Sequence, residues 1–470
     1  MQKISILETY YNLDVSQLAN TTLFCSACGR EHHIPIKLVE SGTNLIEKLP
    51  DVIAAVQFEK SHHIGVIYDR HIEEKLNDLF FEEFQKLKYS YIRIPLGKPG
   101  LLLEASTDVG DKAAVDLPAN VDFLIGVGSG VICDLTKWIA TKTSLPYLIM
   151  GTAASMNAYT SITGTMTENN VKSTRWLNPA KAVLMDSTLI ASAPHEMTSA
   201  GVGDLLARQV SNADWMLSHL IRGTYFCPVP YQMMAAFQDQ LLPVVGNLQT
   251  KDLDAVEKLS DAILASGYSM TILDGETSPS SGSEHVISHF FDFQHEVFGN
   301  PKNLHGEQVG IGTIIMSTAF DILQTINPAE LDIERITQRR PSQMEVNQNN
   351  FQTFGNYHSV FDKVVNQKRI PDDQYHGYIR NIIDSWENNL LELQPYLLPA
   401  GVIRRIMMAA GGHTNLDGVQ RTVDDALQAI LYGSHYRPRY TILDLFWELG
   451  LFPDYADQIL EKSGVLDKNT

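Results

Sequence analysis

The order of segment types along the chain restricts its fold more than any other feature. Up to about residue 190, short apolar runs alternate with amphipathic stretches, and from Pro194 onward only helical patterns continue. Short buried strands separated by helical crossovers are typical of βαβ units and a mainly parallel sheet. We therefore predict an α/β domain followed by an all-helical domain, with the boundary near Ala191–Pro194.

The pattern also locates individual elements. The expected strands are Ile64–Asp69, Tyr91–Pro95, Val121–Val127, Tyr147–Met150 and Ala182–Met185. The expected helices cover approximately His71–Lys88, Ser199–His219, Tyr231–Gly246, Leu253–Thr271 and His305–Gln324. The segment 327–373 is polar and rich in Asn and Gln, so we expect it to be an exposed excursion from the helical domain.

Charge and hydropathy exclude several classes of partner. With 36 basic and 55 acidic residues among 470, the formal net charge is 36 − 55 = −19, which repels nucleic acids and acidic membrane surfaces. No run of about 18 apolar residues is present, which predicts no membrane span. The N-terminal sequence lacks an apolar core followed by small residues, so we expect a cytoplasmic protein.

The four cysteines are Cys25, Cys28, Cys133 and Cys227, too few for a disulfide framework in a chain of this length. Cys25-Ser-Ala-Cys28, followed by His32 and His33, resembles half of a zinc ribbon. A closed structural zinc site needs four ligands, however, and the other two cysteines lie in unrelated contexts. We therefore predict a hairpin turn without a metal at this position.

A glycine-rich turn follows the third expected strand. The sequence around Gly126, Gly128, Ser129 and Gly130 reads as a strand, a tight turn and the start of a helix. Glycines allow the backbone to approach a ligand closely, and a helix N-terminus offers N–H groups to a pyrophosphate. The third glycine of the common dinucleotide fingerprint is missing, so a plain tight turn is the alternative.

Polar residues also lie at the ends of two other expected strands, one of which directly follows the strand of the glycine turn. Thr152 and Ser155 follow the strand that ends at Met150, and Asp69 ends the first strand. Ligands of open α/β sheets bind at the carboxyl ends of the strands, which supports a dinucleotide site there. A carboxylate at Asp69 could accept a hydrogen bond from a ribose 2′-hydroxyl, which would favour NAD over NADP.

Three segments of the helical half carry metal-ligand chemistry. Asp204 opens a helical pattern, His285 and His289 are spaced to share one helical face, and His305 begins another helix. One carboxylate and two imidazoles with an open position suit a catalytic divalent cation. Asp204 could instead complement a helix dipole, and the histidines could be ordinary core or surface residues.

Several motifs in order resemble one family. They are GVGSGVICDLTKWIAT, GTAASMNAYTS, SAGVGDLLARQVSNADW, SGSEHVISH, HGEQVGIGT and RPRYTILDLFWELGLF, spread from about Phe24 to Phe452. Together they resemble the sn-glycerol-1-phosphate dehydrogenase family, a branch of the glycerol dehydrogenase-like, iron-containing alcohol dehydrogenase superfamily. The related 3-dehydroquinate synthases typically have Glu where this chain has Asp204, which favours the dehydrogenase branch.

The resemblance implies a Rossmann-like dinucleotide-binding domain over residues 1–192 and a helical metal- and substrate-binding domain over residues 193–470. It implies NAD(H) or NADP(H) as cofactor, one divalent metal ion per chain, zinc or nickel, and a homo-oligomer. The implied dinucleotide contacts, besides Asp69, are Gly128, Ser129, Gly130, Asp134, Thr152 and Ser155. The implied metal ligands are Asp204, His285 and His305, with His289 near the substrate as a proton relay.

Two positions depart from the family. Asn157 stands where the family often has Asp at the junction of cofactor and substrate, and Arg208 stands where it has Lys. Arg keeps the charge and adds a fork that suits phosphate, so Asn157 and Arg208 are candidate substrate residues, with Arg437 and Arg439 as further phosphate candidates.

The expected reaction interconverts sn-glycerol 1-phosphate and dihydroxyacetone phosphate, a small polyol phosphate. The alternatives are a dehydrogenase of an unphosphorylated polyol or alcohol such as glycerol, and a cyclase resembling 3-dehydroquinate synthase.

Overall fold

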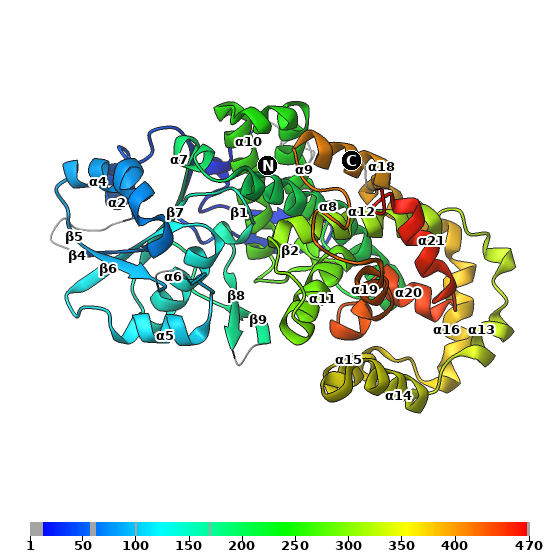
Figure 1. Cartoon of the computed structure of the whole chain (residues 1–470). Coiled ribbons are helices and arrows are strands. Elements are labelled where there is room, and N and C mark those ends of the chain that lie inside the picture. Colours follow the sequence, from blue (N-terminus) through cyan, green and yellow to red (C-terminus); the bar gives the residue numbers. More distant parts are fainter. Residues whose placement is uncertain (1–12, 57–62, 99–100, 169–170, 468–470) are drawn as a thin grey trace. The chain divides into compact units, whose positions relative to one another are not determined.

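The computed structural model describes residues 13–56, 63–98, 101–168 and 171–467. The chain divides into two compact units (Figure 1). The first comprises Met1–Leu205 and Cys227–Thr277, and the second comprises Leu206–Phe226 and Ser278–Thr470.

A six-stranded sheet forms the centre of the first unit, and every strand pair in it is parallel. The order is β3-β10-β7-β6-β4-β5. The strands are β3 (Leu38–Gly42), β4 (His63–Asp69), β5 (Ser90–Leu96), β6 (Val121–Gly128), β7 (Tyr147–Gly151) and β10 (Ala182–Asp186). The five strands expected from the sequence are confirmed. Strand β3 was missed because its sequence, LVESG, is short and carries a glutamate.

Helices cover both faces of this sheet (Figure 1). On one face, alternate residues of β4 and β6 pack against α2 (Leu49–Ala55) and the helical segment 73–86, which contributes Phe80, Phe81 and Phe84. The other face carries α6 (Gly130–Thr143), against which α5 (Thr107–Val115) packs. Burial on both faces explains why the strands are almost continuously apolar rather than alternating.

Two helices beyond residue 193 belong to the first unit. Helix α8 (His195–Arg222) crosses from one unit into the other, whereas α9 (Val229–Leu241) and α10 (Leu253–Thr271) pack against each other. Thr160 Oγ1 donates to the carbonyl of Leu264 in α10 at 2.7 Å. The compact units therefore differ from the division at residue 192 that the sequence suggested, because α10 packs on the sheet domain.

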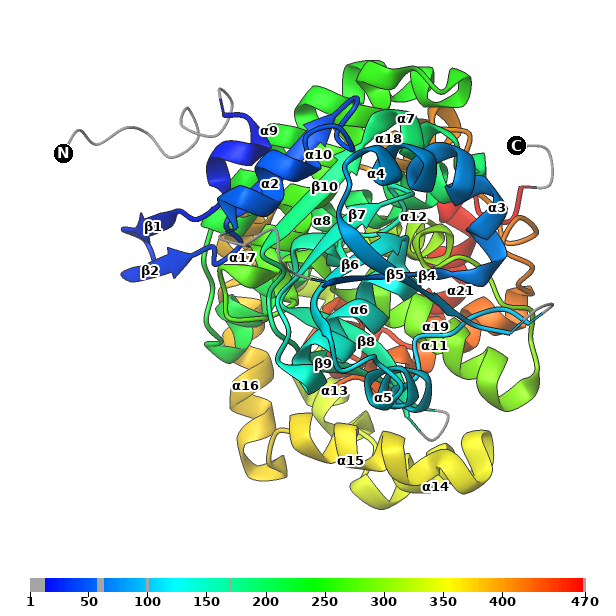
Figure 2. The ribbon, with the colours of Figure 1, turned by 90° about the vertical axis from the view of Figure 1, so that its left-hand side faces the viewer.

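Two antiparallel hairpins accompany the sheet. Strands β1 (Thr22–Cys25) and β2 (Arg30–His33) form one, and β8 (Thr163–Glu168) and β9 (Val171–Trp176) form the other. Figure 2 shows β1 and β2 standing off from the six-stranded sheet, as their separate hydrogen-bond ladder requires.

Helices and connecting loops make up the second unit, with no β-strand among its described residues. Its helices after α8 are α11 (Ser283–Phe298), α12 (His305–Leu323), α13 (Ile333–Arg339), α14 (Gln343–Phe354), α15 (His358–Lys368), α16 (Asp372–Asp384), α17 (Trp386–Leu393), α18 (Ala400–Ala409), α19 (Val423–Tyr436), α20 (Ile442–Glu448) and α21 (Asp454–Ser463). Helix α12 is apolar on all sides and buried along almost its whole length, which makes it the core of the unit. In the described part of the chain, no helix combines the length and apolarity needed to cross a membrane.

The polar segment expected as an excursion is mostly helical, from α13 to the start of α16. Ser342 and Glu345 form a reciprocal capping box that starts α14. Phe354 and Phe361 stack with ring centroids 3.8 Å apart and are both buried. A few aromatic anchors and good caps thus order a sequence whose average polarity suggested irregular structure.

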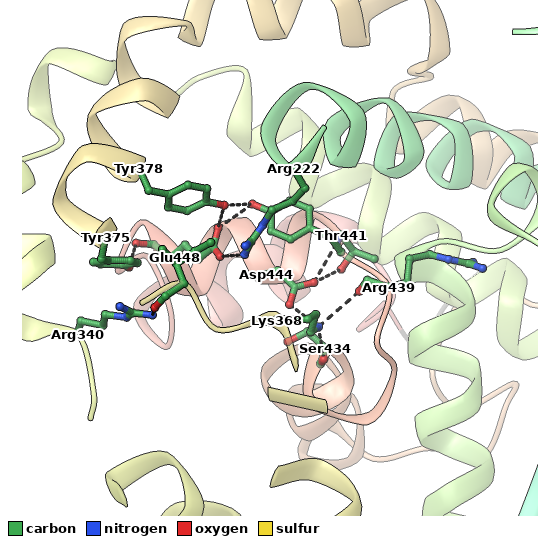
Figure 3. Close-up of polar contacts among 12 residues, drawn as sticks. Arg222, Arg340, Lys368, Tyr375, Tyr378, Ser434, Arg439, Thr441, Asp444 and Glu448 are labelled. Carbon is green, nitrogen blue, oxygen red and sulfur yellow. Dashed lines mark hydrogen bonds and ion pairs between the residues drawn. The ribbon is translucent and has the colours of Figure 1, made fainter. Parts of the chain in front are cut away.

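A charged cluster lies within the second unit (Figure 3). Arg222 pairs with Glu448, and the hydroxyls of Tyr378 and Tyr440 each donate to Glu448 Oε2 at 2.7 Å. The guanidinium also lies over both tyrosine rings, 4.9 and 4.6 Å from their centroids. Burial raises the pKa of Glu448, while the charge of Arg222 opposes that shift. Removing either partner would therefore leave the other charge buried and unpaired.

Candidate functional site

The glycine turn joins β6 to α6 at the carboxyl edge of the sheet. Connections leave β4 and β6 in opposite directions, so the turn lies at the switch point of the sheet, where such folds bind ligands. Ser129 is the N-cap of α6 without a side-chain cap bond. The first N–H groups of this helix lack intrahelical partners by geometry and suit an anionic group.

The three glycines of the turn have different roles. A Cβ at Gly128 would lie 2.5 Å from Ile132 Cβ, and one at Gly126 would collide with Thr136 of α6. These two glycines therefore permit close packing of strand and helix, the task of the missing third glycine. A Cβ at Gly130 would lie 3.2 Å from the flexible side chain of Met156, so this glycine is the least constrained by its own fold.

Asp134 is buried in the second turn of α6 rather than exposed beside the glycine turn. Its Oδ2 accepts a hydrogen bond from Thr165 N of β8 at 3.1 Å. Burial raises the pKa of Asp134 to about 6, although the ammonium of Lys137 lowers it in part. Lys137 is itself fully buried and donates to the carbonyls of Ala158 and Thr163. Asp134 thus tethers β8 to α6 in this structure.

The other predicted dinucleotide residues lie at neighbouring strand ends. Asp69 ends β4, where its Oδ1 accepts from His71 N at 2.9 Å and caps the following helical turn. Thr152 follows β7, and its backbone N–H donates to the carbonyl of Gly128 at 3.1 Å. Asp69, the glycine turn and Thr152 therefore lie at the carboxyl ends of three adjacent strands.

Asp204 lies beside the loop that follows β7. Its Oδ2 accepts from Asn157 N at 3.2 Å, and Asn157 Nδ2 donates to Ser266 Oγ of α10 at 3.1 Å. Gly201 makes this approach possible, because a Cβ there would collide with the carbonyl of Ala154. The carboxylate is nearly fully buried, so a cation beside it would be poorly screened by water.

Three histidines gather in the second unit. The ring centroids of His285 and His305 lie 5.1 Å apart, and His289 lies 6.0 and 5.7 Å from them. His285 and His289 lie one turn apart on α11, as their spacing predicted, and His305 is the first residue of α12.

Neighbouring side chains fix the tautomers of two of these rings. His285 Nδ1 lies 2.8 Å from Glu284 Oε1, a fully buried carboxylate that also accepts from Gly282 N at 2.6 Å. His305 Nδ1 lies 3.3 Å from Ser288 Oγ, which donates its own proton to Gln308 Oε1. Both contacts place the ring proton on Nδ1 and leave the Nε2 lone pair for a cation.

The part of α8 in the second unit carries a buried, positively charged side chain, Arg208. Arg208 is 4% exposed, and its Nη2 donates to the side-chain oxygen of Gln209 at 2.8 Å. The same helix is fixed by Asp214, which accepts from Ser283 N at 2.6 Å and Ile442 N at 2.7 Å. Burial and the nearby Glu284 raise the pKa of Asp214 to about 7. Arginine side chains are mostly exposed in proteins, so burial of the Arg208 guanidinium is unusual for a residue with a purely structural role.

The two C-terminal arginines lie elsewhere in the second unit. Arg437 and Arg439 are partly exposed and follow α19. The carbonyl of Arg439 accepts from Lys368 Nζ at 3.4 Å, and Lys368 also pairs with Asp444 at 2.5 Å. The guanidinium of Arg439 points away from this network (Figure 3).

Sequence reasoning missed the residues that orient the histidines. Glu284 was readable in principle, because it directly precedes His285, but Ser288 and Gln308 carried no signal. The expectation that Cys227 is unrelated to Cys25 was wrong: their sulfurs lie 3.7 Å apart. The β1–β2 hairpin itself was correctly expected.

Comparison with known proteins first defines a class. A profile of the family "Iron-containing alcohol dehydrogenase" matches residues 40–194. The probable glycerol dehydrogenase of Sinorhizobium meliloti superposes with a TM-score of 0.56 at 19% identity, covering 90% of this chain and 96% of that one. The glycerol dehydrogenase of Schizosaccharomyces pombe gives 0.56 at 15% identity, with 91% of each chain covered. The fold is therefore that of iron-containing alcohol dehydrogenases.

Sequence relatives narrow this class. The chain is 25% identical over 455 residues to the glycerol-1-phosphate dehydrogenase [NAD(P)+] of Bacillus licheniformis, which covers 94% of this chain and 96% of the relative. It is 33% identical over 218 residues to the enzyme of that name from Thermococcus sibiricus, covering 46% of this chain and 61% of the relative. These relatives confirm the resemblance to the sn-glycerol-1-phosphate dehydrogenase family.

Proposed function

We propose that this chain is an NAD(P)- and metal-dependent oxidoreductase that interconverts sn-glycerol 1-phosphate and dihydroxyacetone phosphate. The observation that carries the proposal is the similarity over 94% of the chain to a glycerol-1-phosphate dehydrogenase. The fold, the glycine turn at the switch point of the sheet and the oriented histidines are what such chemistry requires.

In this proposal Asp204, His285 and His305 hold one divalent cation. Two neutral imidazoles with Nε2 lone pairs and one carboxylate form a donor set that suits zinc and nickel. Asp204 lies in α8, and further along this helix Ser211 and Asn212 both donate to the carbonyl of Pro279, shortly before α11.

The protein supplies orientation and proton transfer. When bound, a divalent cation would lower the pKa of an alcohol that contacts it, and a nicotinamide would supply the hydride acceptor. His289 would take the alcohol proton and pass it to solvent, which its position next to both other rings and its partial exposure support. Glu284 and Ser288 hold the two ligand rings so that neither must reorganise during the reaction.

Binding of the two negatively charged ligands is divided among separate groups. We propose that the pyrophosphate of the dinucleotide lies at the N-terminus of α6, with Gly128, Ser129, Gly130, Thr152 and Ser155 around it. Asp134 would support this turn indirectly, through its hydrogen bond with Thr165 N of β8. Arg208 is the leading candidate for the substrate phosphate, because a buried guanidinium binds a dianion strongly, and Asn157 would lie near the reacting end. Asp69 would read the ribose and favour NAD.

Kinetics on matched substrates test the proposal. The enzyme should oxidise sn-glycerol 1-phosphate with a much higher kcat/KM than glycerol, with either NAD+ or NADP+ as acceptor. Equal values for glycerol would assign it to unphosphorylated polyols, and turnover of a phosphorylated substrate without net NADH would favour a cyclase.

Four properties stay predictions: zinc or nickel as the cation, a homo-oligomeric state, a cytoplasmic location and the absence of a nucleic-acid partner. Elemental analysis, light scattering, cell fractionation and a nucleic-acid binding assay would test them in turn.

A further inference from the structure

Three cysteines and one histidine meet within the first unit, outside the site described above. Cys25 ends β1, Cys28 lies in the turn that leads to β2, His32 lies on β2, and Cys227 lies between α8 and α9. Their four ligand atoms lie within 4.8 Å of one another. Cys25 and Cys227 are fully buried, and His32 is 2% exposed.

The separations match those of a tetrahedral metal site. With Zn–S of about 2.3 Å and Zn–N of about 2.05 Å, tetrahedral geometry requires S···S near ~3.8 Å and S···N near ~3.6 Å. The sulfurs of Cys25 and Cys227 are 3.7 Å apart. His32 Nε2 lies 3.3 Å from Cys28 Sγ and 3.4 Å from Cys227 Sγ. A cation could therefore be accommodated with only small movements of the side chains.

The surrounding contacts prepare these groups as ligands. His32 Nδ1 lies 2.8 Å from the carbonyl oxygen of Ile272, which can only accept, so Nδ1 carries the proton and Nε2 presents its lone pair to the sulfurs. Cys28 N donates to Cys25 Sγ at 3.4 Å, and Gly29, with φ +70°, closes the turn through a bond to the carbonyl of Cys25. Backbone N–H groups directed at sulfur stabilise a thiolate.

We propose that Cys25, Cys28, His32 and Cys227 bind one structural zinc ion. The four ligands close the coordination sphere, so the ion is structural rather than catalytic. On binding, each thiol gives its proton to solvent, and three thiolates with one dication leave a net charge of −1 on the site.

The zinc ion would fasten the hairpin to the rest of the first unit. Strands β1 and β2 pair with each other and with no strand of the six-stranded sheet among the described residues. An isolated two-stranded hairpin is marginally stable, so a link to the segment before α9 and, through Ile272, to the end of α10 supplies what strand pairing does not. The proposal does not depend on the reaction that the enzyme catalyses.

Cobalt substitution of the full-length chain tests the proposal directly. Protein expressed with Co2+ should show thiolate-to-cobalt charge-transfer absorption and the intense visible bands of a tetrahedral ion. The group of Asp204, His285 and His305 contains no sulfur and cannot produce the charge-transfer band. The band should persist in His285→Ala and disappear in Cys227→Ser and His32→Ala.

His33→Ala is the matched control, because His33 is the exposed neighbour of His32 on β2 and contacts Thr22 Oγ1 instead. It should keep both the band and the zinc content of the unmodified protein. If Cys227→Ser does not fold, the spectrum of the unmodified protein still decides. Absence of the charge-transfer band there, or a Cys25–Cys227 disulfide found by mass spectrometry in freshly purified protein, would overturn the proposal.

Discussion

Replacing Glu284 with Gln should weaken binding of the catalytic cation and leave the fold intact. Glu284 is fully buried, and its Oε1 lies 2.8 Å from His285 Nδ1. A Gln oxygen keeps the shape of this contact but removes the charge that makes the imidazole a stronger ligand. Loss of such a partner costs about 10–100-fold in metal affinity, or ~1.4–2.8 kcal/mol.

The same substitution should not lower the folding stability of the metal-free protein. Burial, together with the charge of Glu284, raises the pKa of Asp214 to about 7. Because this folded pKa lies above the ordinary one, the stabilising contribution of protonated Asp214 is lost as pH rises through about 7. Removing the charge of Glu284 lessens that loss, so the metal-free variant should melt no lower than the parent at neutral pH.

Chelator competition measures the first effect and calorimetry of the metal-free protein measures the second. Affinity is read from activity during titration with a chelator of known strength, so that only the catalytic cation is reported. Glu296→Gln, which removes an exposed carboxylate from the same helix, is the matched control. An unchanged affinity, or a metal loss that follows a parallel loss of stability, would refute the reasoning.

Three further substitutions test other parts of the site. Gly130→Val should lower NADH affinity more than tenfold, over ~1.4 kcal/mol, because its side chain fills the space at the α6 N-terminus while Met156 can yield; unchanged fluorescence titration would contradict this. Arg208→Ala should lower kcat/KM on sn-glycerol 1-phosphate by ~10–150-fold through loss of a charge-assisted bond, and a normal kcat/KM would argue against a phosphate contact there. Asp134→Asn should become more stable than the parent as pH rises from about 4 to about 7, by up to ~3 kcal/mol, because ionising a buried carboxyl with a pKa of about 6 destabilises the parent. Asn at this position still accepts the hydrogen bond from Thr165 N. If urea denaturation gave the same difference in unfolding free energy between variant and parent at every pH in this range, the reasoning would be excluded.

Local patterns predicted much of the fold. Five of the six strands of the central sheet were expected, because a strand buried on both faces is a continuous apolar run. Strand β3 carries Glu40 and Ser41 and gave no such signal. The helical character of 327–373 was missed because it depends on the stacking of Phe354 on Phe361, which average polarity hides.

Candidate ligands were predictable where spacing along one element was informative. His285 and His289 are one helical turn apart, and their proximity followed from that spacing. Cys227 could not be linked to Cys25 in this way, because 202 positions separate them and only the tertiary fold brings them together. Likewise, the hydrogen bond between Asp134 and Thr165 N could not be predicted, because sequence reasoning did not place β8.

Reduction of dihydroxyacetone phosphate, followed by chiral analysis of the product, tests the proposed function most directly. The purified, metal-loaded enzyme should oxidise NADH or NADPH in proportion to the substrate consumed and yield the sn-glycerol 1-phosphate enantiomer. Formation of sn-glycerol 3-phosphate, or equally fast reduction of unphosphorylated dihydroxyacetone, would contradict it.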